Sequence, residues 1–260
     1  MADRRILARV RTLTAVAALA AVLAACGGAG SEPSTPVPGT GGTTAEATAE
    51  PSTTGSEQPT QWVVGADQRN PAEGTTGNVT VTGTTVVVGN PDAEKRLQIF
   101  MDFFCPHCAT LHGVMDPDLV LWAGGDQVAV EYTIVDYLSP RTTHIYSARA
   151  ANLLAYVGDT DPESYPAVLD ALLENKPETT TEVVTDAQLL QIARDAGATL
   201  GEDATAALGE LRYYMWVETG TREAAEAGVT GIPQVWVDGA RVAGETHEET
   251  AAIAREEMNR

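Results

Sequence analysis

The sequence predicts an α/β protein in which a helical segment interrupts a series of β-strands. Short apolar runs bounded by turn residues, which are typical of strands, occur within residues 85–101, at 128–134 and again within 234–243. Between the last two regions, about 100 residues carry apolar side chains at helical spacing. The order of strands, helical block, hairpin and final helix indicates an α/β unit with a helical insertion at about residues 139–220.

The chain divides into three parts by composition. Tryptophans and periodic apolar residues begin near residue 61, and no second change of composition follows before residue 260. We therefore expect one folded domain over 61–260. Residues 26–60 contain no aromatic, leucine, isoleucine or basic residue, so they cannot form a hydrophobic core and are predicted to be a disordered tether.

Residues 1–25 have the pattern of a secretory signal peptide. Four arginines and one acid precede an uncharged apolar run of 14 residues, shorter than the roughly 20 residues that a membrane-spanning helix needs. The run ends in Leu-Ala-Ala before Cys26 and resembles the lipobox of bacterial lipoproteins. This resemblance implies lipidation of Cys26 and a place on the extracytoplasmic face of the bacterial cell membrane. An uncleaved anchor and an ordinary signal peptide with an accidental cysteine are the alternatives.

The predicted strands are bounded by turn residues. They cover residues 85–88, 97–101, 128–134, 234–237 and 240–243. The first two are separated by Gly-Asn-Pro-Asp, which favours a turn. The last two flank Asp238-Gly239, a pair that tolerates the positive φ angles of a tight hairpin.

The predicted helices carry recognisable start signals. Asp161-Pro162 offers an N-cap followed by a first-turn proline, and residues 185–188 and 246–249 resemble capping boxes. We expect helices at 109–115, 139–158, after 161, after 185, at 208–227 and from 246 towards 258.

Charge and cysteine content exclude several functions. Lys and Arg total 16 against 36 Asp and Glu, and the net charge of -20 has the wrong sign for binding phosphate backbones. The 3 cysteines are too few for a disulfide-stapled scaffold or a four-cysteine zinc site. We therefore expect no nucleic-acid partner. The prediction also includes no metal and no cofactor.

The candidate reactive site is Cys105-Pro106-His107-Cys108, which lies between an apolar run and a predicted helix. A cysteine at a helix N-terminus meets unpaired backbone N–H groups and the positive end of the helix dipole, which favour its thiolate. Pro106 suits the first turn, and His107 can add a donor or positive charge. A stabilised thiolate makes the disulfide of the pair a stronger oxidant.

Two other interpretations of the cysteine pair fit the sequence less well. Cys105, Cys108 and His112 have the spacing of a zinc site, but no fourth ligand lies nearby in the sequence. A structural disulfide would close a loop so short that it constrains the unfolded chain little. His112 is predicted to be a polar residue on the helix face, and His144 and His247 are predicted to be surface or capping residues.

Two motifs together indicate a family. The segment from Phe103 to Cys108, Phe-Phe-Cys-Pro-His-Cys, resembles the active site of the DsbA family of thioredoxin-fold oxidoreductases. Gly-Val-Thr-Gly-Ile-Pro, ending at Pro233 before a predicted strand, is similar to the cis-proline loop of that family. Asp102, three residues before the first cysteine, also matches a pattern in DsbA-like proteins of Gram-positive type.

This resemblance implies a thioredoxin-like fold with an inserted helical domain. It implies that Pro233 is cis and faces the sulfurs, and that the backbone of Ile232 pairs with an extended substrate. A substrate thiolate would attack Cys105, with Cys108 as leaving group, and reoxidation would need an integral membrane quinone-linked oxidoreductase. Asp102 would either move a proton near Cys108 or be a solvated turn residue.

The function that follows is disulfide donation to reduced secreted or membrane proteins. A disulfide reductase or isomerase on the same fold is one alternative, and a non-catalytic binding lipoprotein is another. Residues 61–78 receive no role.

Overall fold

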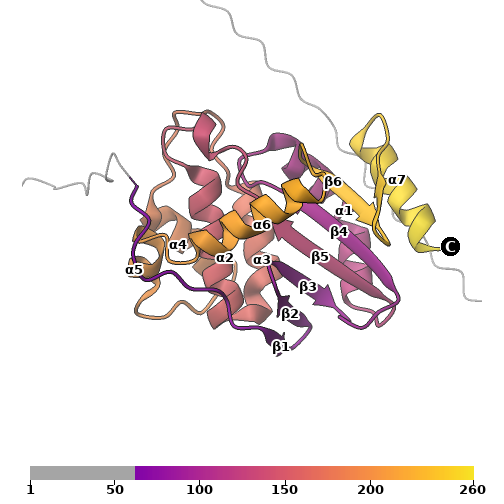
Figure 1. Ribbon diagram of the computed structural model, residues 1–260, viewed down its shortest axis with the longest axis horizontal. Helices are drawn as coiled ribbons and strands as arrows, with labels where there is room; N and C mark the ends of the chain where they lie inside the picture. Colours follow the sequence, from indigo (N-terminus) through magenta and orange to yellow (C-terminus); the bar gives the residue numbers. More distant parts are fainter. Residues whose placement is uncertain (1–61) are drawn as a thin grey trace, which may run out of the picture. The chain divides into compact units, whose positions relative to one another are not determined.

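The computed structural model describes residues 62–260, and the predicted signal peptide, Cys26 and the whole predicted tether lie outside these residues. Within 62–260, no helix combines the length and the apolar character needed to cross a membrane. The described chain contains one mixed sheet with helices on both faces and a group of helices beside one end of it (Figure 1).

The sheet has seven strands in the order β1-β2-β3-β5-β4-β6-β7. They are β1 (Gly74–Thr76), β2 (Val79–Thr82), β3 (Thr85–Gly89), β4 (Lys95–Met101), β5 (Val128–Ile134), β6 (Gln234–Val237) and β7 (Ala240–Val242). Strands β4 and β5 are parallel, whereas every other neighbouring pair among the described strands is antiparallel. All seven residues of β5 are buried, because β5 lies at the centre of the sheet and helices pack against it.

The helices confirm the predicted α/β class and the helical insertion. Helix α1 (Pro106–Ala123) follows β4, and α7 (His247–Met258) packs against both α1 and β6. The insertion consists of α2 (Tyr146–Thr160), α3 (Tyr165–Glu174), α4 (Asp186–Asp195) and α5 (Ala204–Gly209), with short 3-10 turns at Ser139–Arg141 and Pro162–Ser164. Helix α6 (Tyr214–Glu226) then returns to cross the sheet (Figure 1).

Several local predictions are confirmed. Thr185 and Gln188 form the expected capping box at the start of α4, and the Thr246 hydroxyl accepts a hydrogen bond from Glu249 N (3.1 Å) at the start of α7. The hairpin between β6 and β7 turns at Asp238 (φ 48°) and Gly239 (φ 79°), as the Asp-Gly pair predicts.

The single helix predicted at 208–227 is wrong. Helices α5 and α6 are separate, and Leu211 between them has a φ of 49°. Asn152 on α2 holds both ends of the break, because its side chain accepts from Tyr213 N (2.7 Å) and donates to the Ala207 carbonyl (3.2 Å). A buried amide from elsewhere in the chain thus replaces the hydrogen bonds of a continuous helix.

The starts of two other predicted helices differ from prediction, one in its position and one in its capping. The segment 139–158 begins as a 3-10 turn, and α2 starts only after Ile145, which has a φ of 39°. The Asp161 carboxylate does not cap helical N–H groups; it accepts instead from the Ser164 hydroxyl (2.9 Å) and from Thr199 N (2.7 Å).

Strands β1 and β2 were not predicted, although the sequence carries a signal for them. Val79 and Val81 are buried, while Thr82 of β2 is exposed, and Gly77 in the turn before β2 has a φ of 59°. This alternation after a Gly-Asn pair is typical of a hairpin.

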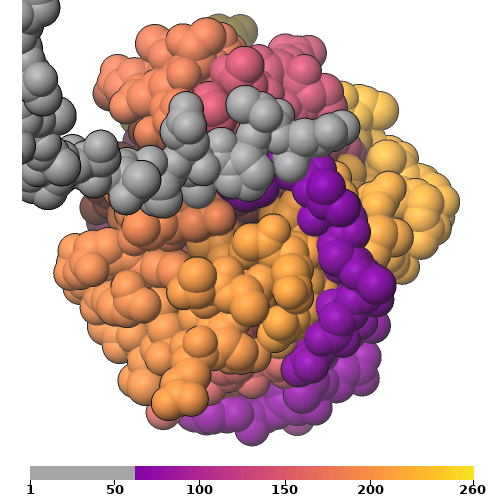
Figure 2. Space-filling model, turned by 90° about the vertical axis from the view of Figure 1, so that its left-hand side faces the viewer, coloured from indigo at the N-terminus to yellow at the C-terminus, as the bar shows by residue number. Residues whose placement is uncertain are grey.

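Residues 62–73 form an N-terminal strap along the insertion, shown in indigo in Figure 2. Backbone hydrogen bonds join Gly65 N to the Glu210 carbonyl and Arg69 N to the Arg212 carbonyl, each at 2.8 Å. At its start, the Trp62 ring stacks on the buried Arg149 guanidinium, 4.3 Å from the ring centre. The strap therefore gives the unassigned segment a structural role.

Candidate active site

The two cysteines lie at the junction of β4 and α1. Cys105 is the N-cap residue of α1, and its carbonyl accepts from Cys108 N (3.1 Å) and Ala109 N (3.2 Å). Pro106 takes the first helical position, where its missing N–H leaves no bond unmade. Cys105 is 4% exposed and Cys108 is 1% exposed, so only Cys105 offers a surface to other molecules.

The two thiols differ in acidity. The pKa of Cys105 is lowered by a hydrogen bond from the Cys108 thiol and by the backbone N–H groups of Cys108 and His107, against the opposing effects of burial and of Asp102. Burial raises the pKa of Cys108, and the partner sulfur raises it further. Cys105 is therefore the sulfur that ionises first, as required of an attacking and leaving thiolate.

His107 adds a donor to the site, one of the two predicted contributions, but through its backbone and not through its ring. Its imidazole is exposed and stacks on the ring of His247 from α7, with ring centroids 5.4 Å apart at an angle of 27°. The contribution of His107 to the Cys105 thiolate comes through its backbone N–H. This stacking also makes His247 a neighbour of the site, a contact across 140 positions that the sequence does not signal.

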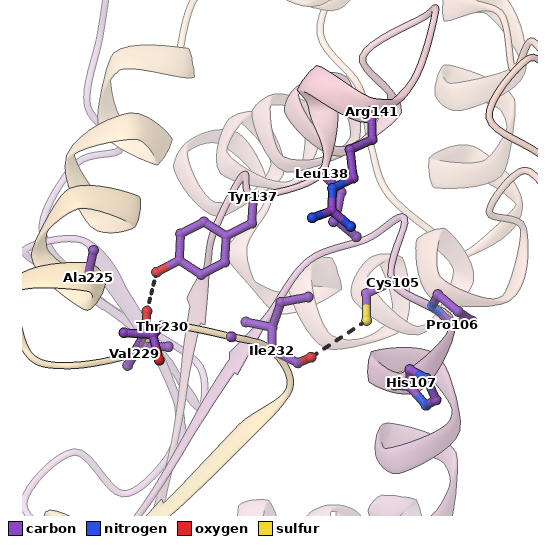
Figure 3. Close-up of a pocket in the computed structure, with 11 residues that line it drawn as sticks. Cys105, Pro106, His107, Tyr137, Leu138, Arg141, Ala225, Val229, Thr230 and Ile232 are labelled. Atoms are coloured by element: carbon purple, nitrogen blue, oxygen red, sulfur yellow. Dashed lines mark hydrogen bonds between the residues drawn. The ribbon is translucent and has the colours of Figure 1, made fainter.

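The loop before β6 faces Cys105. The Ile232–Pro233 peptide bond is cis, as the resemblance implies. The Cys105 Sγ lies 3.9 Å from the Ile232 carbonyl oxygen, the contact drawn in Figure 3. The pairing of β4 with β6, in which Phe100 is opposite Gln234, brings the two motifs together.

Asp102 is fully buried beneath the cysteine turn, so the alternative of a solvated turn residue is wrong. Its carboxylate accepts four hydrogen bonds, from Phe104 N (2.9 Å), Tyr137 N (2.9 Å), Leu138 N (3.0 Å) and the Ser147 hydroxyl (2.5 Å). Burial raises the pKa of Asp102 to about 6, although the hydrogen bonds oppose the shift. Asp102 thus joins the cysteine turn to the loop after β5 and to helix α2.

A groove of about 630 Å³ opens beside Cys105. Its walls come from the cysteine turn, the segment after β5 and the loop before β6, and they are largely apolar (Figure 3). Four further residues that were not predicted also line it: Tyr137, Leu138, Arg141 and Ala225. No motif marks these residues; only their place after a buried strand and before the cis-proline loop could have suggested them.

The residue expected on the polar face of α1, His112, is buried instead. It is 7% exposed, packs beside Tyr132, and its Nδ1 lies 3.6 Å from a carboxylate oxygen of Asp170 on α3. Burial lowers its pKa to about 4, so it is neutral at physiological pH. Among residues 62–260, no three His, Cys, Asp or Glu side chains are arranged to hold a metal ion.

A thioredoxin family model, Thioredoxin_4, matches residues 81–254, which is more than half of the chain. The chain belongs to the thioredoxin family. The match begins within β2, spans β3 to β7 and includes both the cysteine pair and the cis-proline loop.

Solved structures share the fold of this thioredoxin-family chain. Oxidised BdbD from Bacillus subtilis is 19% identical with a TM-score of 0.59, over 73% of this chain and 100% of that one. MdbA, a thiol-disulfide oxidoreductase from Corynebacterium diphtheriae, is 20% identical with a TM-score of 0.58, over 70% and 95%. Reduced DsbA from Mycobacterium tuberculosis is 22% identical with a TM-score of 0.53, over 71% and 94%. No curated protein matches the chain in sequence. These likenesses confirm a thioredoxin-like fold with a helical insertion, the arrangement expected of a DsbA-like protein.

Proposed function

We propose that this thioredoxin-family protein is a thiol:disulfide oxidoreductase that donates its Cys105–Cys108 disulfide to reduced secreted proteins. The observation that carries the proposal is the position of the Cys105 sulfur. It lies in the wall of an apolar groove and faces the Ile232 carbonyl, while Cys108 is buried behind it. A protein that only binds its partners needs neither a reactive thiol in its groove nor a second thiol that donates a hydrogen bond to the first.

The reaction follows from the different accessibility of the two sulfurs. A substrate thiolate attacks Cys105 in the enzyme disulfide, and the S–S bond breaks to release Cys108 as a thiolate, which Asp102 N–H stabilises by donating to Cys108 Sγ (3.5 Å). A second substrate thiol, on losing its proton, attacks the substrate sulfur of the mixed disulfide and displaces Cys105. Two substrate thiols thereby become one disulfide, and the enzyme leaves as the dithiol.

The cis-proline loop supplies the docking edge for the substrate. Among the described residues, the Ile232 carbonyl accepts a hydrogen bond only from the Cys105 thiol. It can therefore accept one from a substrate once that sulfur has reacted. An extended peptide can therefore pair with this backbone and place its own cysteine at Cys105.

The membrane tether and the redox partner belong to the same proposal. They rest on the lipobox-like sequence at Cys26, the composition of 26–60 and the resemblance to DsbA-like proteins, which use an integral membrane quinone-linked oxidoreductase for reoxidation. Membrane fractionation of a Cys26→Ala variant tests the tether: release into the soluble fraction is expected, and continued membrane association would contradict lipidation at Cys26.

The reduction potential of the Cys105–Cys108 couple tests the direction of transfer. Because the Cys105 thiolate is stabilised, we expect a potential above about -180 mV, well above the roughly -270 mV of cytosolic thioredoxins. The couple would be equilibrated with glutathione buffers and the dithiol fraction measured by alkylation and mass spectrometry. A value near that of thioredoxin would overturn disulfide donation and favour the reductase alternative.

A further inference from the structure

The groove beside Cys105 contains one fixed positive charge, the guanidinium of Arg141. We infer that Arg141 makes the groove selective for substrates that carry an acidic side chain near the reacting cysteine. This inference rests on the proposed function, since it concerns which reduced proteins reach Cys105.

The backbone of Arg141 is held in a defined position relative to the reacting sulfur, and its side chain is exposed. It is the last residue of the 3-10 turn Ser139–Arg141, and its backbone N donates to the Leu138 carbonyl (2.9 Å). Leu138 N in turn donates to the Asp102 carboxylate, which also accepts from Phe104 N beside the cysteine turn. Figure 3 shows the guanidinium extending from this turn towards the space between Tyr137 and Cys105.

The charge of Arg141 is not neutralised by any residue within 62–260, where it makes no ion pair. Within the same residues Lys176, Arg194 and Arg241 likewise make no ion pair, but none of these three lines the groove. The basic residues paired with carboxylates in the described chain are Arg69, Lys95, Arg96, Arg149, Arg212, Arg222, Arg255 and Arg260.

The acidic groups on the segments around the groove are engaged elsewhere. Asp136, five residues before Arg141, accepts from the Tyr214 hydroxyl (3.0 Å) and from Ser139 N (3.1 Å). Glu226, next to the groove residue Ala225, pairs with Arg222 on the same helix. The guanidinium therefore stays available for a ligand that enters the groove.

The surroundings of Arg141 favour a carboxylate over other groups. Its guanidinium can bind both oxygens of a carboxylate through two parallel hydrogen bonds. Its neighbours in the groove wall, Tyr137, Leu138, Val229 and Ile232, carry no charge, so they do not compete with Arg141 for a carboxylate. The thiolate of Cys105 is stabilised by Cys108 and by backbone N–H groups, which leaves the charge of Arg141 for the substrate.

Matched peptides test the inference. Dithiol peptides that differ only in one residue beside the first cysteine, Glu, Gln or Lys, are oxidised by the disulfide form of the full chain at low salt, and kcat/KM is compared. We expect wild type to prefer the Glu peptide over the Gln peptide by about 5–10-fold, with the ratio falling as salt rises. Arg141→Gln should bring the ratio to near one, Arg141→Lys should keep part of it, and Arg141→Glu should favour the Lys peptide.

Arg194→Gln is the matched control, because it removes the same charge from an exposed position on α4 outside the groove. Its preference and its rates should equal those of wild type. An equal rate on all three peptides with wild type, or an unchanged preference in Arg141→Gln, would show that Arg141 is only a solvated side chain. Failure to oxidise any peptide would instead contradict the proposed function.

Discussion

Replacing Cys105 by serine is expected to abolish oxidation of a dithiol peptide, with a loss of at least about a thousandfold in rate. The variant cannot form the enzyme disulfide, and the remaining Cys108 is only 1% exposed, so no substrate thiol can reach it. Cys108→Ser is expected to lose turnover too, but for a different reason. Cys105 still reacts with an oxidised peptide, and without Cys108 to displace the peptide, the mixed disulfide persists.

Mass spectrometry with peptide mapping distinguishes these two outcomes. The trapped peptide should lie on Cys105 in Cys108→Ser, and no peptide should lie on Cys108 in Cys105→Ser; mapping also separates any adduct at Cys26. An adduct on Cys108 would mean that the buried sulfur is the one that attacks, and it would overturn the order of steps proposed for the reaction.

After the loss of Cys105, removal of the Asp102 carboxylate is expected to change stability and peptide oxidation the most. Asp102→Ala leaves three backbone N–H groups and the Ser147 hydroxyl without their buried acceptor. A loss on the order of 3 kcal/mol or more in the free energy of unfolding is expected, because each orphaned buried donor costs about 1–3 kcal/mol. Peptide oxidation should fall as well, since the cysteine turn and the groove segment after β5 lose their shared anchor. Urea titration and kcat/KM measure the two effects.

Asp102 is expected to make the free energy of unfolding rise as pH falls, because folding raises the pKa of its carboxyl group. Its pKa rises from 3.8 to about 6 on folding, so between these values the folded state binds a proton that the unfolded state lacks. The wild type should therefore gain stability from this group as pH falls from about 6 to 3.8. In Asp102→Asn, this gain should disappear, and the pKa of Cys105, which the carboxylate raises, should fall.

Asp159→Asn is the matched control for Asp102. Its carboxylate accepts from Ala72 N (2.7 Å) and the Tyr213 hydroxyl (2.5 Å), and so holds the N-terminal strap, away from the cysteine turn. It should lower stability without changing the pKa of Cys105. If Asp102→Asn keeps both the wild-type pH profile and the wild-type Cys105 pKa, then Asp102 does not position or influence the site.

The parts of the site that sequence predicts are those set by local chemistry. The Cys-Pro-His-Cys turn needs only a helix start and a proline at its first position, and the Asp-Gly hairpin needs only two residues that accept positive φ. The predicted strands followed for the same reason, because alternation and turn residues act over a few positions.

The parts that sequence does not predict depend on residues far apart in the chain. From the local sequence alone, Asp102 is predicted to be a turn residue. Its burial depends on Tyr137 and Leu138, whose N–H groups donate to its carboxylate from the segment after β5. His107 meets His247, and Asn152 divides a segment that is helical by periodicity. In each case, a tertiary contact overrides a local preference whose energy is smaller.

The pairing of β6 with β4 determines when the active site can form during synthesis of the chain. A chain is synthesised from its N-terminus, so the two thiols at 105 and 108 emerge long before residues 234–237, which form the strand beside them. Until that strand is in place, the thiols have neither the Ile232 carbonyl nor the wall of the groove that Val229 and Ile232 provide. The reactive centre is thus completed only after residues 229–237 have been synthesised, and a chain that stops before them carries a pair of ordinary thiols without a substrate site.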